Sequence, residues 1–314
     1  MYTTFFGFDE PPFSISPDPR FLYLSDSHKE ALAHMIYGVQ ERKGFTVITG
    51  DVGTGKTTLV NKFREGLHEG VRIISLNNPE LSREDFYYVI SRALGFDVGL
   101  SKARFLDALE RYLLAAEERR EQVVLIVDEA QNLPRALLEE IRLLSNLETA
   151  SRKLLQIVLV GQQELNDKLA QPSLRQLRQR ISQKFHIAPL SREETAAYIE
   201  HRLAVAGYAG GAQLFSGRAI SRIYDFTGGY PRLINVLCDN LLLAAYAREL
   251  QRIGASLVRE VCQNLEAAYV QTTPAKHPAR RVADRPERAA FYGLVALAVL
   301  FFLLVFYRTA HPAW

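Results

Sequence analysis

Cysteine is scarce and charge is nearly balanced in this chain of 314 residues. Its two cysteines, Cys238 and Cys262, match no metal-ligand spacing, so we expect buried thiols in a reducing compartment, with a disulfide or sensor role as the alternative. The formal net charge is only +3, which supplies no global attraction for nucleic acid. Residues 1–8 lack a basic leader and a sustained apolar core, so we expect no secretory signal.

The hydrophobic periodicity changes along the chain in a regular order. Short apolar runs typical of strands lie at 45–49, 71–76, 123–127, 154–160 and 184–187. Helical patterns separate them, including 83–94, 103–118 and 136–147, and this alternation predicts a parallel sheet sandwiched by helices. After Pro189 the strands stop, and helical patterns at 191–206, 216–226, 231–250 and 255–268 predict a smaller all-α domain.

The sequence GDVGTGKT, from Gly50 to Thr57, is a complete GxxxxGK[ST] phosphate loop between a strand-like run and a helix-forming stretch. In such a loop the glycines let backbone N–H groups surround the phosphates, while Lys56 reaches the β and γ oxygens and Thr57 ligates Mg²⁺. We therefore expect ATP and Mg²⁺ as ligands, a chance glycine turn being the alternative. The expected nucleotide-binding residues are Gly50, Asp51, Val52, Gly53, Thr54, Gly55, Lys56, Thr57 and Thr58.

Two carboxylates, Asp128 and Glu129, follow the apolar run 123–127. A buried parallel strand that ends in carboxylates places them at the carboxyl edge of the sheet, where ligands bind in open α/β folds. Asp128 suits Mg²⁺, and Glu129 would orient and polarise the attacking water. A strand end that merely caps the next helix is the alternative.

Further motifs flank these two. Asp128-Glu129-Ala130-Gln131 is followed by Gly228-Gly229-Tyr230-Pro231-Arg232, and Phe5-Phe6-Gly7-Phe8 and Pro17-Asp18-Pro19-Arg20 precede the phosphate loop. Together they resemble an AAA+ ATPase of the general secretion pathway protein A type, over roughly residues 1–269. The phosphate loop alone is unspecific, but its combination with FFGF, DEAQ and GGYPR is specific. Related ATPases serve type II secretion, mannose-sensitive pilus biogenesis and exopolysaccharide systems.

The resemblance implies roles for three polar residues. Gln162 would be the sensor of the γ-phosphate and water, unless it is an ordinary exposed loop residue. Arg232 would be sensor 2, because Pro231 fits the first turn of a helix and an arginine beside it could reach the γ-phosphate; a surface arginine is the alternative. Arg180 would be the arginine finger that enters a neighbouring subunit's site.

The finger assignment leaves alternatives open. Arg175 and Arg178 lie one turn apart on the same stretch and are the other candidates, and all three could simply form a basic helix. The aromatic residues of the N-terminal segment are equally ambiguous. The resemblance places them beside the adenine, while plain packing under the sheet explains them as well.

An uncharged run from 289 to 307, AAFYGLVALAVLFFLLVFY, is about the length needed to cross a bilayer, the alternative being a buried core helix. Basic residues crowd its N-terminal side, against only Arg308 beyond it. They are Lys276, Arg280, Arg281, Arg285 and Arg288. The positive-inside rule then predicts a single C-terminal span in the inner membrane with the ATPase domain in the cytoplasm.

The expected domain order follows from these features. It is an N-terminal segment near the nucleotide (1–43), a P-loop nucleotide-binding and hydrolysis domain (44–189), a helical lid domain (190–270), a basic flexible linker (271–288), a transmembrane helix (289–307) and a short non-cytoplasmic tail (308–314).

The expected function is Mg²⁺-dependent hydrolysis of ATP to ADP and phosphate, coupled to lid closure and to contacts with identical or partner AAA+ subunits. The resemblance implies that this work serves an inner-membrane export or assembly machine. Secretion ATPases of this type carry a long periplasmic region that engages peptidoglycan, and since this chain stops at Trp314 we expect no direct peptidoglycan binding. The alternatives are a DNA-binding regulator resembling transposition ATPases, against which the near-neutral charge argues, and a nucleotide-switched scaffold, which Glu129 disfavours.

Overall fold

The computed structural model describes residues 1–16, 18–77, 81–96, 101–210 and 213–272. The chain divides into two compact units, Met1–Gln263 and Asn264–Trp314. All features below belong to the first unit. Of the second unit, the structure describes only the end of helix α12 (Ala255–Thr272).

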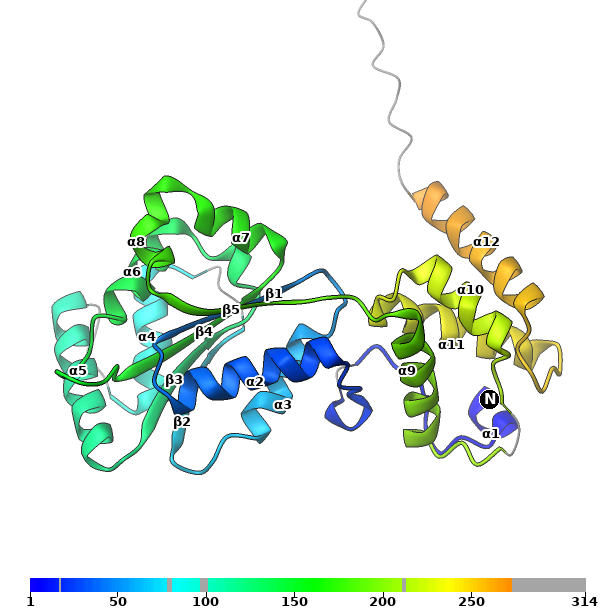
Figure 1. Ribbon diagram of the computed structural model, residues 1–314, viewed down its shortest axis with the longest axis horizontal. Helices are drawn as coiled ribbons and strands as arrows, with labels where there is room; N and C mark the ends of the chain where they lie inside the picture. The colour runs from blue at the N-terminus through cyan, green and yellow to red at the C-terminus, as the bar shows by residue number, and fades with distance from the viewer. Residues whose placement is uncertain (17, 78–80, 97–100, 211–212, 273–314) are drawn as a thin grey trace, which may run out of the picture. The chain divides into compact units, whose positions relative to one another are not determined.

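A five-stranded parallel sheet forms the centre of the first unit, with the strand order β2-β3-β4-β1-β5 (Figure 1). The strands are β1 (Phe45–Gly50), β2 (Val71–Leu76), β3 (Gln122–Val127), β4 (Leu155–Gly161) and β5 (Ile181–Ile187). Strands are thus found at all five places where the sequence predicts them. β5 begins three residues earlier than expected, because its pairing with β1 extends to Ile181 through polar residues that give no apolar signal.

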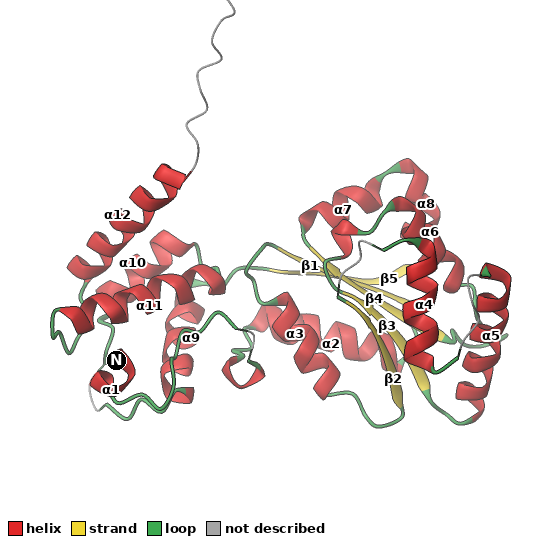
Figure 2. Cartoon of the chain, turned by 180° about the vertical axis from the view of Figure 1, so that it is seen from behind, coloured by secondary structure: helices red, strands yellow, loops and turns green. Residues whose placement is uncertain are grey.

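Helices cover both faces of the sheet, as Figures 1 and 2 show. One face packs against α2 (Asp26–Gln40) and α3 (Lys56–Glu65). The other packs against α4 (Arg83–Leu94), α5 (Lys102–Glu118), α6 (Arg135–Leu144), α7 (Gln163–Ala170) and α8 (Arg175–Arg178). Successive residues of β3 face the two cores in turn: Val124 packs with α2 and α3, and Leu125 packs with the helices of the other face. This is why the strand is apolar throughout. The expected α/β sandwich is confirmed.

After the sheet come the helices α9 (Arg192–Val205), α10 (Gly217–Thr227) and α11 (Pro231–Ala247) and then α12, in the segment expected to form the helical lid. α9 begins with a capping box, in which the Ser191 side chain accepts from the N–H of Glu194 and the Glu194 carboxylate accepts from the N–H of Ser191. These two hydrogen bonds satisfy backbone N–H donors that the first turn of the helix would otherwise leave unpaired. The switch from strands to helices after Pro189 is therefore confirmed.

The first aromatic residues of the chain pack on the helical lid. Phe5, in the short α1 (Tyr2–Phe6), meets Tyr246 edge-to-face with ring centroids 5.5 Å apart. Phe8 lies against Tyr208 at 5.5 Å, and Phe13 meets Phe215 edge-to-face at 6.1 Å. The proposed packing of these rings under the sheet is therefore wrong; α2 occupies that position instead.

The predicted transmembrane helix requires correction. Among the described residues, no helix has both the length and the apolar composition to cross a bilayer. α12 has 18 residues, but it carries Arg259, Glu260 and Glu266 and so cannot serve as a span. The run at 289–307, on which the prediction depended, lies outside the described residues, as do its basic flank and the tail 308–314. The fold is thus a parallel α/β sheet with a helical lid, and the expected single span in the inner membrane is not supported.

Candidate active site

The phosphate loop joins the end of β1 to the start of α3. Gly53 and Gly55 adopt left-handed backbone conformations, with φ angles of 83° and 92°. At Gly53 an added Cβ would also lie 2.8 Å from the Cβ of Arg232, so a side chain there would displace the lid loop. The motif therefore needs glycine at these positions for two reasons: both backbones are left-handed, and Arg232 approaches Gly53 too closely for a side chain.

Lys56 is buried at the start of α3. Its ammonium donates to the carbonyl oxygens of Gly50 and Asp51, both at 2.9 Å. Burial lowers the pKa of Lys56, while the nearby carboxylates of Glu129 and Asp128 oppose that shift. The ammonium is thus held over the loop by groups that the oxygens of a bound phosphate can replace.

Thr57 and Asp128 place two oxygen atoms side by side. The Thr57 hydroxyl donates to Oδ2 of Asp128 at 2.9 Å, and Oδ1 of Asp128 accepts from the N–H of Glu129 at 2.9 Å. Mg²⁺ in nucleotide sites takes one or two protein oxygens and completes its shell with phosphate and water. The pair fits this ion, although the part of the chain that is described holds no cluster of three or more metal-binding side chains.

Glu129 has a left-handed backbone (φ 52°, ψ 36°), which is unusual for a residue with a side chain. Its Oε2 accepts two amide hydrogen bonds, from Nε2 of Gln131 at 2.5 Å and from Nε2 of Gln162 at 3.2 Å. The structure therefore brings Gln162 to the carboxylate it was expected to accompany. It adds Gln131, which the sequence marked only as part of the DEAQ motif.

A cavity of about 380 Å³ opens at this edge of the sheet. Phosphate-loop residues, Glu129 and Gln162 line one part of it, while Ile15, Phe21, Tyr23 and other residues between 14 and 23 line another. The lid contributes Pro231 and Arg232, and the main-chain N–H of Arg232 donates to the carbonyl oxygen of Gly53 at 3.2 Å. Of the predicted nucleotide residues, 52–58 and Arg232 thus line one space, whereas Gly50 and Asp51 do not, and the side chains of Ile15, Phe21 and Tyr23 beside it suit a base.

The three arginine-finger candidates lie away from this cavity. Arg180 is half-buried and donates to the carbonyl oxygen and the hydroxyl of Ser145, at 3.3 and 3.1 Å. Arg178 is exposed and donates to the carbonyl oxygen of Ala170 at 3.0 Å, and Arg175 is exposed at the start of α8. None of the three lines the described cavity, so a finger role would be exerted on a neighbouring subunit and stays a prediction.

His28 is a site residue that the sequence analysis missed. Its Nε2 lies 2.8 Å from the carbonyl oxygen of Thr54 in the phosphate loop, and its Nδ1 lies 2.6 Å from the Ser25 hydroxyl. Burial lowers the pKa of His28, which favours the neutral ring with Nε2–H donating to Thr54 and Nδ1 accepting from Ser25. Ser25 as the N-cap of α2 was readable from sequence, but the contact with Thr54 was not.

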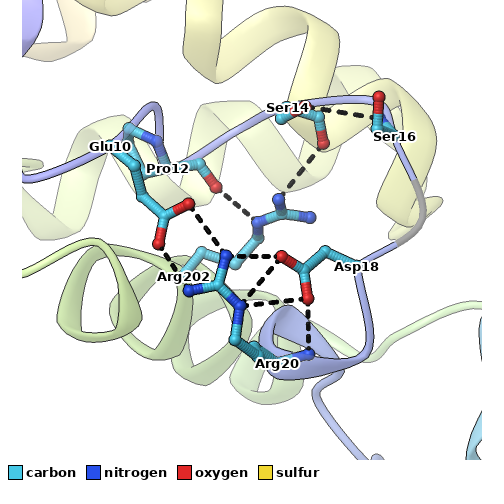
Figure 3. Close-up of polar contacts among 7 residues, drawn as sticks. All are labelled: Glu10, Pro12, Ser14, Ser16, Asp18, Arg20 and Arg202. Carbon is cyan, nitrogen blue, oxygen red and sulfur yellow. Dashed lines mark hydrogen bonds and ion pairs between the residues drawn. The ribbon is translucent and has the colours of Figure 1, made fainter.

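Arg202 on α9 is the second missed residue (Figure 3). It is buried, lines the cavity, and donates to the main-chain oxygens of Pro12 at 2.5 Å and Ser14 at 3.2 Å. Its guanidinium also lies over the Phe21 ring, 4.7 Å from the centroid. Arg202 therefore fixes the wall formed by the first residues of the chain to the helical lid.

Comparison with known proteins agrees with this arrangement. The AAA domain family matches residues 39–169. General secretion pathway protein A of Aeromonas hydrophila is 45% identical over 255 residues, which cover 81% of this chain and 46% of that protein. The chain thus spans less than half the length of this relative.

Solved structures show the same fold at low identity. Cdc6p of Pyrobaculum aerophilum is 21% identical with a TM-score of 0.60, over 81% of this chain and 70% of that one. Drosophila ORC bound to DNA is 20% identical with a TM-score of 0.61, over 83% and 66% of the two chains. The RuvB Holliday junction branch migration motor of Thermotoga maritima is 17% identical with a TM-score of 0.52, over 77% and 69%. The AAA domain match at residues 39–169 thus contains both the phosphate loop and the carboxylate pair, and the chain is similar to general secretion pathway protein A.

Proposed function

We propose that this chain is an AAA ATPase that hydrolyses ATP to ADP and phosphate with Mg²⁺, and that the cycle drives assembly or operation of a secretion, pilus or exopolysaccharide export system. The observation that carries the catalytic part is the 2.9 Å contact between the Thr57 hydroxyl and Asp128, beside Glu129 at the same cavity. It joins the phosphate loop to the strand that bears the carboxylates, which is the arrangement phosphoryl transfer requires.

Binding would use the phosphate loop and Lys56. The backbone N–H groups at the start of α3 would donate to the phosphates, and the positive end of the helix would favour their charge. Lys56 would exchange the carbonyl oxygens of Gly50 and Asp51 for phosphate oxygens. Mg²⁺, held by Thr57 and Asp128, would neutralise charge on those oxygens.

Hydrolysis would depend on Glu129. A carboxylate at the cavity wall can orient a water molecule and accept its proton, and Gln162 beside it can hydrogen-bond the same water or the γ-phosphate. Arg232, on the lid, would add a positive charge near the γ-phosphate. Because Arg232 lies on the helical segment after the sheet and the phosphate loop lies on the sheet, its engagement would couple the position of the helices to the nucleotide state.

The export role depends on the similarity to general secretion pathway protein A. We propose that the chain works as a homo-oligomer or with a partner AAA+ subunit, and that a component of the export machine receives the motion. Co-purification of the tagged chain tests this part. Recovery of export components supports the proposal, whereas recovery of DNA-transposition proteins, with hydrolysis stimulated by DNA, would favour the DNA-binding regulator.

The catalytic part is tested with two variants. Lys56→Ala should lose ATP binding, because the ammonium that is expected to contact the β and γ oxygens is removed. Glu129→Gln should bind ATP with unchanged affinity and hydrolyse it at least about 100-fold more slowly, since only the group that activates water is altered. Equal rates of phosphate release for Glu129→Gln and the natural chain would refute hydrolysis through Glu129.

A further inference from the structure

Gln131 holds the Glu129 carboxylate from outside the cavity. Its Nε2 donates to Oε2 of Glu129 at 2.5 Å, the shorter of the two amide contacts to that oxygen. Glu129 and Gln162 line the cavity, whereas Gln131 is not among the lining residues. Gln131 therefore acts on a substrate only through the lining residues that it contacts, foremost Glu129.

The orientation of the Gln131 amide is fixed by its other end. Its Oε1 accepts from the backbone N–H of Gln162 at 3.0 Å, and a backbone N–H can only donate. The NH₂ end must then face Glu129, which requires the carboxylate to be an acceptor. The amide thus links Glu129 at the end of β3 to Gln162, the residue that precedes α7.

Two further contacts keep Gln131 in place. Its main-chain oxygen accepts from the ammonium of Lys168 on α7, which also donates to the main-chain oxygen of Leu133 at 2.9 Å. Its Oε1 lies against the end of β4, where a Cβ added at Gly161 would come within 2.9 Å of it. A side chain at that strand end would displace the amide, so the glycine leaves room for this link.

The link matters because Glu129 is in an unfavourable backbone conformation. A left-handed backbone is sterically disfavoured for a residue with a side chain and persists where surrounding contacts fix it. The two amide bonds to Oε2 also remove the rotational freedom of the carboxylate. A base fixed in one orientation loses less entropy in reaching the geometry needed for proton transfer.

We propose that Gln131 is a positioning residue for ATP hydrolysis, which fixes Oε2 of Glu129 to the start of α7 and so presents the carboxylate to the attacking water in one orientation. The inference depends on the proposed role of Glu129 as the group that activates water. It assigns to the fourth residue of the DEAQ motif a function in catalysis that is separate from nucleotide binding.

The test compares Gln131→Met, which keeps the length but removes donor and acceptor, with Gln131→Glu, which keeps an acceptor for Gln162 and removes the donor. Both should lower kcat by about 10- to 100-fold, with the ATP dissociation constant changed less than about threefold. Gln163→Met is the matched control, since Gln163 is exposed on α7 and bonds only to Asn166 among the described contacts. It should leave kcat unchanged.

A double variant separates positioning from a general structural role. Because Gln131 acts through Glu129, adding Gln131→Met to Glu129→Gln should not reduce the residual rate further. The inference would be overturned if the double variant hydrolysed ATP more slowly than Glu129→Gln alone. A kcat of Gln131→Glu equal to that of the natural chain would also overturn it. If Glu129→Gln keeps the full rate of hydrolysis, the proposed function itself is refuted. If Glu129→Gln is slow while Gln131→Met and Gln131→Glu are both fully active, only the role of Gln131 is refuted.

Discussion

The hydroxyl of Tyr230 donates to Oδ2 of Asp51 at 2.8 Å, which joins the residue before α11 to the phosphate loop. The bond to this carboxylate raises the pKa of Tyr230, so the phenol keeps its proton and remains the donor. With the Arg232 N–H on Gly53, it is the second contact from the GGYPR motif to this loop. The lid therefore touches the same residues that are expected to bind phosphate.

Removing this bond should weaken the attachment of the lid. Tyr230→Phe keeps the ring and deletes the donor, for a net cost of about 1 kcal/mol. We expect faster hydrogen exchange at the start of α11 and in the phosphate loop, with the sheet unaffected. Tyr224→Phe, on α10, is the control and should exchange like the natural chain. Identical exchange in the Tyr230 variant would show that the contact does not hold the lid.

Figure 3 shows two arginines, of which Arg202 is buried and Arg20 is exposed, so Arg20 can serve as the control for Arg202. Arg202→Met should leave the buried main-chain oxygen of Pro12 without its donor and also removes the bond to the exposed Ser14, which together cost about 2–4 kcal/mol of unfolding free energy. It should also weaken ATP binding, because that stretch lines the cavity. Urea unfolding and titration with a fluorescent ATP analogue measure both effects.

The control is Arg20→Met. Arg20 is exposed and its partners, Glu10 and Asp18, remain in water without it, so we expect no measurable change in stability. Equal stability losses for Arg202→Met and Arg20→Met would contradict the assignment of Arg202 as the residue that fixes this wall.

His28 predicts a pH dependence of stability. Its pKa is lowered in the folded chain, so the unfolded chain binds the proton more readily. The stabilising effect of the neutral ring is then complete above the ordinary histidine pKa of about 6.5 and is lost as the pH falls towards the lower folded value. His28→Gln, whose amide can still donate to Thr54, should flatten the decline in unfolding free energy below pH 6.5.

His201, whose pKa is lowered by burial and by Arg202, contributes a decline of the same sign. His201→Gln therefore serves as the comparison, and the two effects should add because the histidines share no contact among those described. An unchanged acid slope in His28→Gln would show that this histidine, which contacts the phosphate loop from α2, does not govern the slope.

The arginine finger is tested by mixing subunits. Arg180→Ala should bind ATP normally but hydrolyse it about 10³-fold or more slowly, and mixing it with Glu129→Gln subunits should restore some activity. It should also lose about 1 kcal/mol of stability through Ser145, whereas the exposed Arg175→Ala should be neutral in stability. Full activity of Arg180→Ala, at a rate independent of protein concentration, would favour a monomeric switch.

Local sequence patterns were sufficient to predict much of the fold and of the candidate site. The phosphate loop, the carboxylates after β3 and the five strand positions each depend on neighbouring residues, so spacing and periodicity predicted them. The start of β5 was less predictable, because an edge strand with alternate polar residues gains its conformation from pairing with β1 rather than from its own apolar content. The resemblance, in turn, supplied Gln162 and Arg232, and the structure places both at the cavity.

The sequence by itself determined the kind of chemistry, because the residue types that bind phosphate, metal and water lie in short contiguous motifs. Only the tertiary structure decided what holds those motifs. His28 meets Thr54 across 26 residues, Gln131 meets Gln162 across 31, and Arg202 meets Ser14 across 188. It also placed the first aromatic residues on the lid. Contacts of this range arise when separate elements pack, and no local pattern records which elements will meet.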